Sequence, residues 1–194
     1  MDKRVVELTN ILLNRIPPSK VHIVEVGTYM GNTAVGILKI LQNNKYTPTY
    51  TGFDLFENMA KKKELKVTNP GIYKRINAAD KNTVLNAIQV KKVRDKLNNN
   101  GFGSISTLIK GNTKNTIPRN SNEIRKAAFV YIDGGHDYQS VSTDWCNIQL
   151  FGSKGTIVVF DDTHTHGVGK LIKEIADDGY LPKRSYGNRA FVIL

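Results

Sequence analysis

The sequence predicts an α/β fold with one mostly parallel sheet that helices cover on both faces. Short apolar runs alternate along the chain with amphipathic segments of helical length. Most of the apolar runs are unbroken, as expected of strands that are buried on both faces. Alternating strands and helices imply the crossover connections of a parallel sheet. The last two runs are separated only by a Gly-Asn turn, which predicts an antiparallel hairpin.

The predicted strands share this apolar character and cover 21–26, 50–54, 105–110, 128–133, 155–160, 180–185 and 189–194. The predicted helices have apolar residues three or four positions apart and cover 2–15, 32–42, 82–97, 122–126, 138–150 and 167–176. Pro17 and Pro18 end the first helix, because proline cannot continue one. Polar residues predict a turn over 43–48 and a loop over 111–121. The result is a seven-stranded sheet, parallel except at its C-terminal hairpin.

The segment 56–103 is long for a single crossover between two strands. Its first half is polar and basic, and only its second half has a helical pattern. We therefore expect part of it to be a lid or an insertion that contacts the substrate. A chain of 194 residues is long enough for one well-buried domain and marginal for two, so we expect a single domain over 1–194.

The composition is ordinary for a soluble globular protein, with 40% hydrophobic and 23% charged residues. There is no secretory signal or membrane-spanning stretch, and the single cysteine excludes an internal disulfide, so a cytoplasmic protein without a membrane partner is expected. The net charge of +11 suits a nucleic-acid partner. The lysines are spread along the chain, however, and we do not favour that partner. The N-terminal helix offers a contact for a homo-oligomer.

The first predicted strand runs into the sequence Glu-Val-Gly-Thr-Tyr-Met-Gly at 25–31, and a helix follows at once. A strand, a glycine turn and a helix begin a Rossmann-like, doubly wound nucleotide-binding fold. Gly27 lets a ligand approach the backbone, and Gly31 opens a helix whose free N–H groups suit an anion. A dinucleotide motif has glycine where Tyr29 stands. Glu25 is an awkward neighbour for phosphates and suits a ligand with a cationic amino group.

This spacing of an acid and two glycines resembles motif I of the class I S-adenosylmethionine-dependent methyltransferases. Asp54 strengthens the resemblance, because an acid that ends the second strand can accept two hydrogen bonds from ribose hydroxyls. The resemblance implies that the methionine end of the cofactor is lined by Glu25, Gly27, Thr28, Tyr29 and Gly31. It also implies that Asp54 holds the ribose and that Asn112, just after the third strand, contacts the adenine.

Three further carboxylates lie at the ends of two other predicted strands. Asp133 ends the strand at 128–133, and Asp161 and Asp162 follow the strand at 155–160. Parallel strands end at one edge of a sheet, so these acids should converge beside the cofactor. Like charges so close together repel unless something neutralises them, and all-oxygen ligands favour Mg²⁺ or another hard divalent cation. The alternative is that the acids are helix caps and turn formers.

The spacing of Asp133 from the doubled acid resembles that of metal-dependent O-methyltransferases of the catechol, caffeoyl-CoA and macrocin types. The resemblance implies that Asp133, Asp161 and Asp162 bind the metal and that Asp133 also borders the cofactor. His136 stands where the first two types have a lysine, taken as the general base. Its ordinary pKa of about 6.5 suits proton removal at neutral pH, and Asp133 is the other candidate for this role.

The expected function is methyl transfer from S-adenosylmethionine to a hydroxyl of a small molecule or sugar, assisted by a divalent metal ion. Alternatives are a methyltransferase that acts on a ribose hydroxyl of nucleic acid, a nucleotide-binding oxidoreductase, and a non-catalytic binding domain. Tyr29 argues against the oxidoreductase. A zinc site made by His136, His164 and His166 would fit the three acids poorly. His136 could instead only support its loop.

Overall fold

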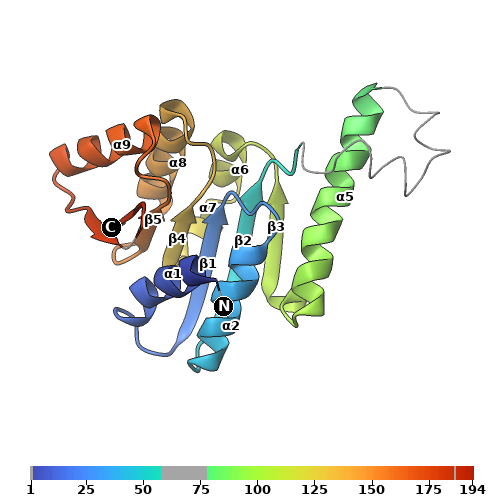
Figure 1. The fold of residues 1–194 in the computed structure, drawn as a ribbon, viewed down its shortest axis with the longest axis horizontal. Helices are drawn as coiled ribbons and strands as arrows, with labels where there is room; N and C mark the ends of the chain where they lie inside the picture. The colour runs from blue at the N-terminus through green and yellow to red at the C-terminus, as the bar shows by residue number, and fades with distance from the viewer. Residues whose placement is uncertain (1, 58–77, 186) are drawn as a thin grey trace.

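The computed structural model of the chain describes residues 2–57, 78–185 and 187–194. Within these residues, seven strands form one sheet in the order β3-β2-β1-β4-β5-β7-β6, with helices on either side (Figure 1). The first five strands run parallel to one another, and β7 runs antiparallel to both β5 and β6. The predicted mostly parallel, seven-stranded sheet with a C-terminal hairpin is therefore confirmed.

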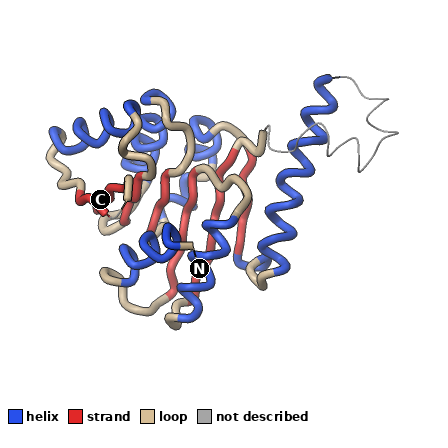
Figure 2. Tube along the Cα trace, in the orientation of Figure 1, coloured by secondary structure: helices blue, strands red, loops and turns tan. Residues whose placement is uncertain are grey.

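The strands are β1 (Lys20–Val26), β2 (Thr47–Asp54), β3 (Ser106–Lys110), β4 (Phe129–Ile132), β5 (Ile157–Phe160), β6 (Lys183–Ser185) and β7 (Arg189–Ile193). The helices, blue in Figure 2, are α1 (Lys3–Leu13), α2 (Asn32–Asn43), α5 (Ala78–Asn99), α6 (Thr113–Arg119), α7 (Ser121–Arg125), α8 (Tyr138–Phe151) and α9 (His166–Asp177). A short 3-10 helix, η1 (Gly103–Ile105), precedes β3. No helix among the described residues is long and apolar enough to cross a membrane.

Each face of the sheet has its own hydrophobic core, because consecutive strand residues point to opposite sides. Ile23 and Phe129 belong to the core under α1, α2 and the C-terminal part of α5. Their neighbours Val24 and Val130 belong to the core under the helices α6 to α9. All residues of β4 and β5 are buried, which explains why both strands are unbroken apolar runs in the sequence.

Helix α1 is firmly attached to the body of the protein. Its first turn is capped by the Asp2 side chain, which accepts a hydrogen bond from the Arg4 backbone N–H at 2.9 Å. The apolar face of the helix, including Val5 and Leu8, is buried against α2. Gly36 of α2 makes room for this contact, since a Cβ there would lie 2.6 Å from a methyl of Val5. The start of α1 is thereby held close to the end of β1.

Two sequence predictions about irregular segments were wrong in part. The predicted loop over 111–121 contains α6, which is capped by the Asn112 side chain and has a fully buried Ile117 on its inner face. A single apolar residue in a polar segment gives no helical periodicity, so the pattern could not reveal this helix. The predicted turn over 43–48 overlaps the start of β2, where Pro48 pairs with Val21 of β1. The segment 58–77, part of the expected lid or insertion, lies outside the described residues.

Candidate active site

The carboxyl ends of β1, β2 and β4 open into a cleft of about 280 Å³, which we call the cofactor cleft. This is where ligands bind in open α/β sheets, outside the carboxyl ends of the strands. The cleft is lined by five residues that the sequence predicts to bind the cofactor, namely Gly27, Tyr29, Asp54, Asn112 and Asp133. The fold thus brings together residues from the ends of four different strands.

The turn after β1 can pass close to β4 only because residue 27 is glycine. Gly27 has a φ of 93°, and a Cβ at this position would lie 2.2 Å from the carbonyl oxygen of Asp133. The turn is held by Asp54, whose Oδ2 accepts a hydrogen bond from the Tyr29 N–H at 2.8 Å and whose Oδ1 accepts one from the Phe56 N–H at 2.5 Å. Each oxygen keeps a lone pair with which to accept a ribose hydroxyl.

The other three residues that the sequence predicts to bind the cofactor lie behind the cleft and do not line it. Glu25 is only 2% exposed and accepts a hydrogen bond from the hydroxyl of Tyr50 at 2.5 Å. Burial raises the pKa of Glu25 to about 8, so this side chain is mostly protonated at neutral pH. Thr28 is buried beside the same Tyr50 hydroxyl, at 3.2 Å. Gly31 has a φ of 70° and lies against Val93 of α5. These residues support the turn from behind.

The sequence did not reveal two buried polar residues, one in the lining of the cleft and one beside its turn. Asp144 of α8 lines it and is 2% exposed, and among the described residues none donates a hydrogen bond to its Oδ1. Burial raises the pKa of Asp144 to about 6. Gln89 of α5 is 1% exposed and donates a hydrogen bond to the Tyr29 carbonyl at 3.2 Å. A signal for Asp144 did exist, because it occupies the buried face of α8 between Val141 and Ile148.

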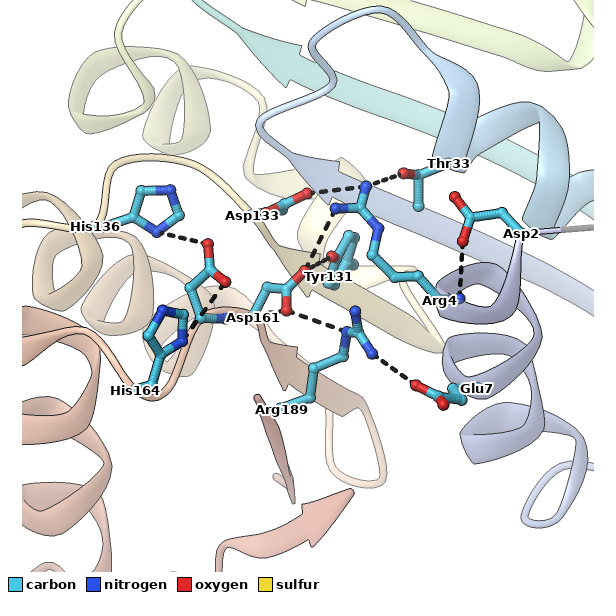
Figure 3. A network of polar contacts seen from close by, with 11 residues as sticks. Asp2, Arg4, Glu7, Thr33, Tyr131, Asp133, His136, Asp161, His164 and Arg189 are labelled. Carbon is cyan, nitrogen blue, oxygen red and sulfur yellow. Dashed lines mark hydrogen bonds and ion pairs between the residues drawn. The ribbon is translucent and has the colours of Figure 1, made fainter. Parts of the chain in front are cut away.

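The acids after β4 and β5 meet two arginines from the two ends of the chain (Figure 3). Arg4 of α1 lies between Asp133 and Asp161, with nitrogen–oxygen distances of 3.4 Å and 3.6 Å. Arg189 of β7 contacts Asp161 at 3.1 Å and donates a hydrogen bond to Glu7 of α1 at 2.8 Å. We call these five residues the acid–arginine cluster. Two guanidinium groups thus compensate the charges of Asp133 and Asp161.

Burial makes the charges of this cluster depend on one another. Asp161 is 6% exposed and also accepts hydrogen bonds from the hydroxyl of Tyr131 and from the backbone N–H of Asp162. Burial raises the pKa of Asp133 to about 6, and Arg4 limits the rise whereas Asp161 adds to it. Burial alone would lower the pKa of Arg4, but Tyr131 and the two acids raise it above its ordinary value. Arg4 therefore stays charged.

The third predicted metal ligand turns away from the other two. Asp162 has a φ of 50°, and its carboxylate lies 3.4 Å from Nδ1 of His136 and 3.8 Å from Nδ1 of His164. Asp133 and Asp161 share a guanidinium instead. Within the described residues, no three His, Cys, Asp or Glu side chains are grouped so as to hold a metal ion. The side chains in this arrangement do not fit the predicted Mg²⁺, nor a zinc ion bound by His136, His164 and His166.

Residues 24–163 match a protein family described as a methyltransferase domain. The chain belongs to this family. It is an S-adenosylmethionine-dependent methyltransferase, as its glycine turn and strand-end acids predict. The matched residues include the turn after β1, Asp54, and the acids after β4 and β5. No curated protein sequence matches the chain significantly.

Solved methyltransferases share the fold at low sequence identity. CalS11, a TDP-rhamnose 3'-O-methyltransferase of calicheamicin biosynthesis, has 20% identity and a TM-score of 0.62 over 98% of this chain and 76% of its own. An O-methyltransferase from Bacillus cereus in complex with SAH (S-adenosylhomocysteine) has 12% identity and a TM-score of 0.61, covering 100% and 82%. MycE from the mycinamycin pathway, solved with Mg and SAH, has 15% identity and a TM-score of 0.52, covering 89% and 44%. These likenesses confirm the Rossmann-like class.

The methyltransferase has a second cavity, of about 390 Å³, on the other side of its acids. We call it the outer cavity, and its lining residues are Lys3, Arg4, Glu7, Asp161, Asp162, Gly187, Asn188 and Arg189. The loop after β5 is joined to the β6–β7 turn here, because the Thr163 N–H donates a hydrogen bond to the Asn188 carbonyl at 2.8 Å. Asp133 lines the cofactor cleft, Asp161 lines the outer cavity, and Arg4 contacts both acids.

Proposed function

We propose that this methyltransferase transfers the methyl group of S-adenosylmethionine to a hydroxyl of a small molecule or a sugar. The observation that carries the proposal is the placement of two cavities on either side of one charged cluster. A cofactor in the cleft and an acceptor in the outer cavity would meet at Asp133, Arg4 and Asp161. A cavity of about 390 Å³ suits a small acceptor, and CalS11, by its name, methylates a sugar nucleotide.

In this proposal the cofactor cleft binds the cofactor through charged and polar side chains. Asp54 accepts hydrogen bonds from the ribose hydroxyls, and the Gly27 turn lets the ligand lie against the backbone. Asn112 borders the adenine end of the cleft together with Asp144. The unpartnered Oδ1 of Asp144 suits the adenine amino group, since a buried acceptor without a donor is costly. Asp133 supplies a negative charge near the cofactor's sulfonium.

The transfer itself needs an acceptor oxygen, a positioned methyl group and a group that takes the proton. The oxygen forms a bond to the methyl carbon while the carbon–sulfur bond breaks, and the electron pair of that bond stays on sulfur. The hydroxyl proton passes to Nε2 of His136, whose Nδ1 faces Asp162 at 3.4 Å. The side chain of His136 is 47% exposed, so the proton can leave to water. The protein's contribution is mainly positioning and electrostatics.

The sequence also predicts a divalent cation that Asp133, Asp161 and Asp162 would bind. MycE was solved with Mg, which favours it. In this chain the arginine contacts and the turn of Asp162 toward histidines leave no shared set of free carboxylate oxygens. The proposed mechanism therefore has no step that runs through a metal.

Calorimetry with SAH and with NAD tests the cofactor, and radiolabelled S-adenosylmethionine tests the acceptor against nucleotide sugars, catechols and RNA. We expect binding of SAH, no binding of NAD, and label transfer to a small hydroxylated acceptor. His136→Gln should lower turnover by roughly 100-fold or more with SAH affinity unchanged. The matched control is His166→Gln, which lies beside a different cavity. Label transfer to RNA alone, or binding of NAD without SAH, would overturn the proposal.

A further inference from the structure

We propose that Arg4 is the resident cation of the acid pair Asp133–Asp161 and takes the position that a divalent metal ion would need. The inference rests on the proposed function and deepens it, because it assigns the electrostatic role at the transfer point to a side chain of α1. Asp133 borders the cofactor cleft, and Asp161 borders the outer cavity. A cation between them lies where the methyl group would pass from the cofactor to the acceptor.

The first support is the geometry of the guanidinium group. Arg4 Nη2 lies 3.4 Å from Asp133 Oδ2, and Nη1 lies 3.6 Å from Asp161 Oδ2. Nη2 also donates a hydrogen bond to Oγ1 of Thr33 at 2.5 Å, which fixes the guanidinium from the side of α2. A planar guanidinium presents its donors in a fixed fork, so it can serve two carboxylates at once. The two acids converge on one cation, and that cation belongs to the chain.

The second support is that both oxygens of Asp161 already have partners. Its Oδ1 lies 3.0 Å from the Asp162 N–H and 3.1 Å from Nε of Arg189. Its Oδ2 accepts a hydrogen bond from the Tyr131 hydroxyl and forms an ion pair with Arg4. The Tyr131 hydroxyl and the Asp162 N–H donate hydrogen bonds to this carboxylate, and the two guanidinium groups form ion pairs with it. A metal ion would have to compete with these partners for Asp161.

The third support is the anchoring of α1. Arg4 is followed by Val5, which is 3% exposed and seated on Gly36 of α2. One turn on, Glu7 is tied to Arg189 at 2.8 Å. The backbone of Arg4 is therefore held by the packed part of α1 that follows it. The arginine belongs to a packed helix and not to a loose terminus.

These contacts make Arg4 and a metal ion mutually exclusive. A dication placed between Asp133 and Asp161 would stand within a few ångströms of two guanidinium groups, whose repulsion opposes its binding. Arg4 also lines the outer cavity, so it presents a fixed positive charge toward an acceptor oxygen. Such a charge stabilises the negative charge that develops on that oxygen during transfer. The arginine thereby provides what a metal ion would otherwise supply.

The test is a titration with Mn²⁺, followed by electron paramagnetic resonance, with Mg²⁺-dependent melting as a second readout. Wild-type protein should show no saturable binding up to about 1 mM, because Arg4 holds the site. Arg4→Gln should uncover one site that binds Mn²⁺ at least roughly tenfold more tightly, since it leaves Asp133 without its guanidinium partner and Asp161 with Arg189 alone. Arg4→Lys keeps the charge and should still exclude the ion. Adding Asp161→Asn to Arg4→Gln should abolish the new site.

Lys3→Gln is the matched control, because it removes one positive charge from the neighbouring, exposed position of the same helix. It should leave Mn²⁺ binding as in the wild type. Arg4→Met keeps most of the apolar stem and should behave like Arg4→Gln, so a folding defect in one variant does not decide the matter. Circular dichroism and melting confirm that each variant is folded.

The inference is overturned if wild-type protein binds one Mn²⁺ ion that Asp133→Asn and Asp161→Asn each abolish. It is also overturned if folded Arg4→Gln and Arg4→Met gain no Mn²⁺ affinity. Calorimetry with SAH on the same samples separates this result from the proposed function. Failure of wild-type protein to bind SAH would refute the proposed function, and the metal titration would still show whether Arg4 excludes the ion. Retained SAH binding with a metal at the wild-type acid pair would refute only the inference.

Discussion

The cofactor cleft and the acid–arginine cluster lie side by side but are assembled in different ways. The centre of the cleft is one continuous segment, the turn after β1, in which Gly27 and Tyr29 are two positions apart. Its other predicted cofactor residues come from the ends of three further strands. The cluster joins acids after β4 and β5 to arginines at positions 4 and 189, near opposite ends of the sequence. A run of acids shows that something must neutralise them, but only the fold shows whether this is a metal ion or a guanidinium group.

The largest effect is expected from a substitution that distorts the turn after β1. Gly27→Ala would place a Cβ 2.2 Å from the Asp133 carbonyl oxygen, at a φ of 93° that L-residues rarely adopt. We expect a loss of at least about 2 kcal/mol of unfolding free energy and of measurable SAH binding, because the turn must move. Denaturant unfolding and calorimetry measure the two effects.

Gly155→Ala is the matched control for this substitution. Gly155 has nearly the same φ, 91°, but a Cβ there would meet nothing within 4 Å. It should show the backbone strain alone, with SAH affinity unchanged. Equal losses of stability in the two variants would mean that the close approach to Asp133 contributes nothing.

A smaller effect is expected at the ribose-binding position of the cleft. Asp54→Asn keeps the size of the side chain but removes the charge from a group that already holds two backbone N–H groups. We expect SAH affinity to fall about 10- to 100-fold, as for a lost hydrogen bond to a charged group. Glu57→Gln, which removes an exposed carboxylate three residues on, should leave affinity unchanged. Unchanged affinity in Asp54→Asn would remove Asp54 from the cofactor site.

The sequence predicted what is local and apolar, and it missed what depends on distant partners. The buried strands β4 and β5 and the Gly27 turn follow from periodicity and backbone chemistry, which are readable in short windows. The role of Arg4 could not be predicted, because an arginine on an amphipathic helix normally faces solvent. Helix α6 was missed because its polar residues form no apolar face. The positions of the acids were predicted, but their partners were not.

The pH dependence of cofactor binding sharpens the contrast between the two regions, because Asp133 belongs to both. Burial raises the pKa of Asp133 from 3.8 to about 6, so the side chain is ionised above that pH and protonated below it. S-adenosylmethionine carries a sulfonium charge that SAH lacks. As pH falls through 6, we therefore expect affinity for S-adenosylmethionine to fall about three- to tenfold relative to affinity for SAH.

Calorimetry with both ligands between pH 5 and pH 8 measures this ratio. Asp133→Asn should make the ratio independent of pH and leave it at the low-pH value, because an amide cannot ionise. Asp137→Asn is the control, as it removes an exposed carboxylate that caps α8 and lies outside the lining of the cleft. A ratio that is flat in the wild type would show that Asp133 does not sense the sulfonium.

The smallest expected effect tests whether the two regions are energetically separate. Glu7 and Arg189 are 16% and 10% exposed and tie α1 to β7, whereas the Lys91–Asp95 pair on α5 is 74% and 48% exposed. Glu7→Gln should therefore cost about 1–2 kcal/mol of unfolding free energy, and Asp95→Asn less than about 0.5. Neither should change SAH affinity, since Glu7 acts on the cluster through Arg189 and not on the cleft. If Glu7→Gln weakened SAH binding as much as Asp54→Asn, the cleft and the cluster would be one cooperative unit, and the anchoring of α1 would reach the cofactor directly.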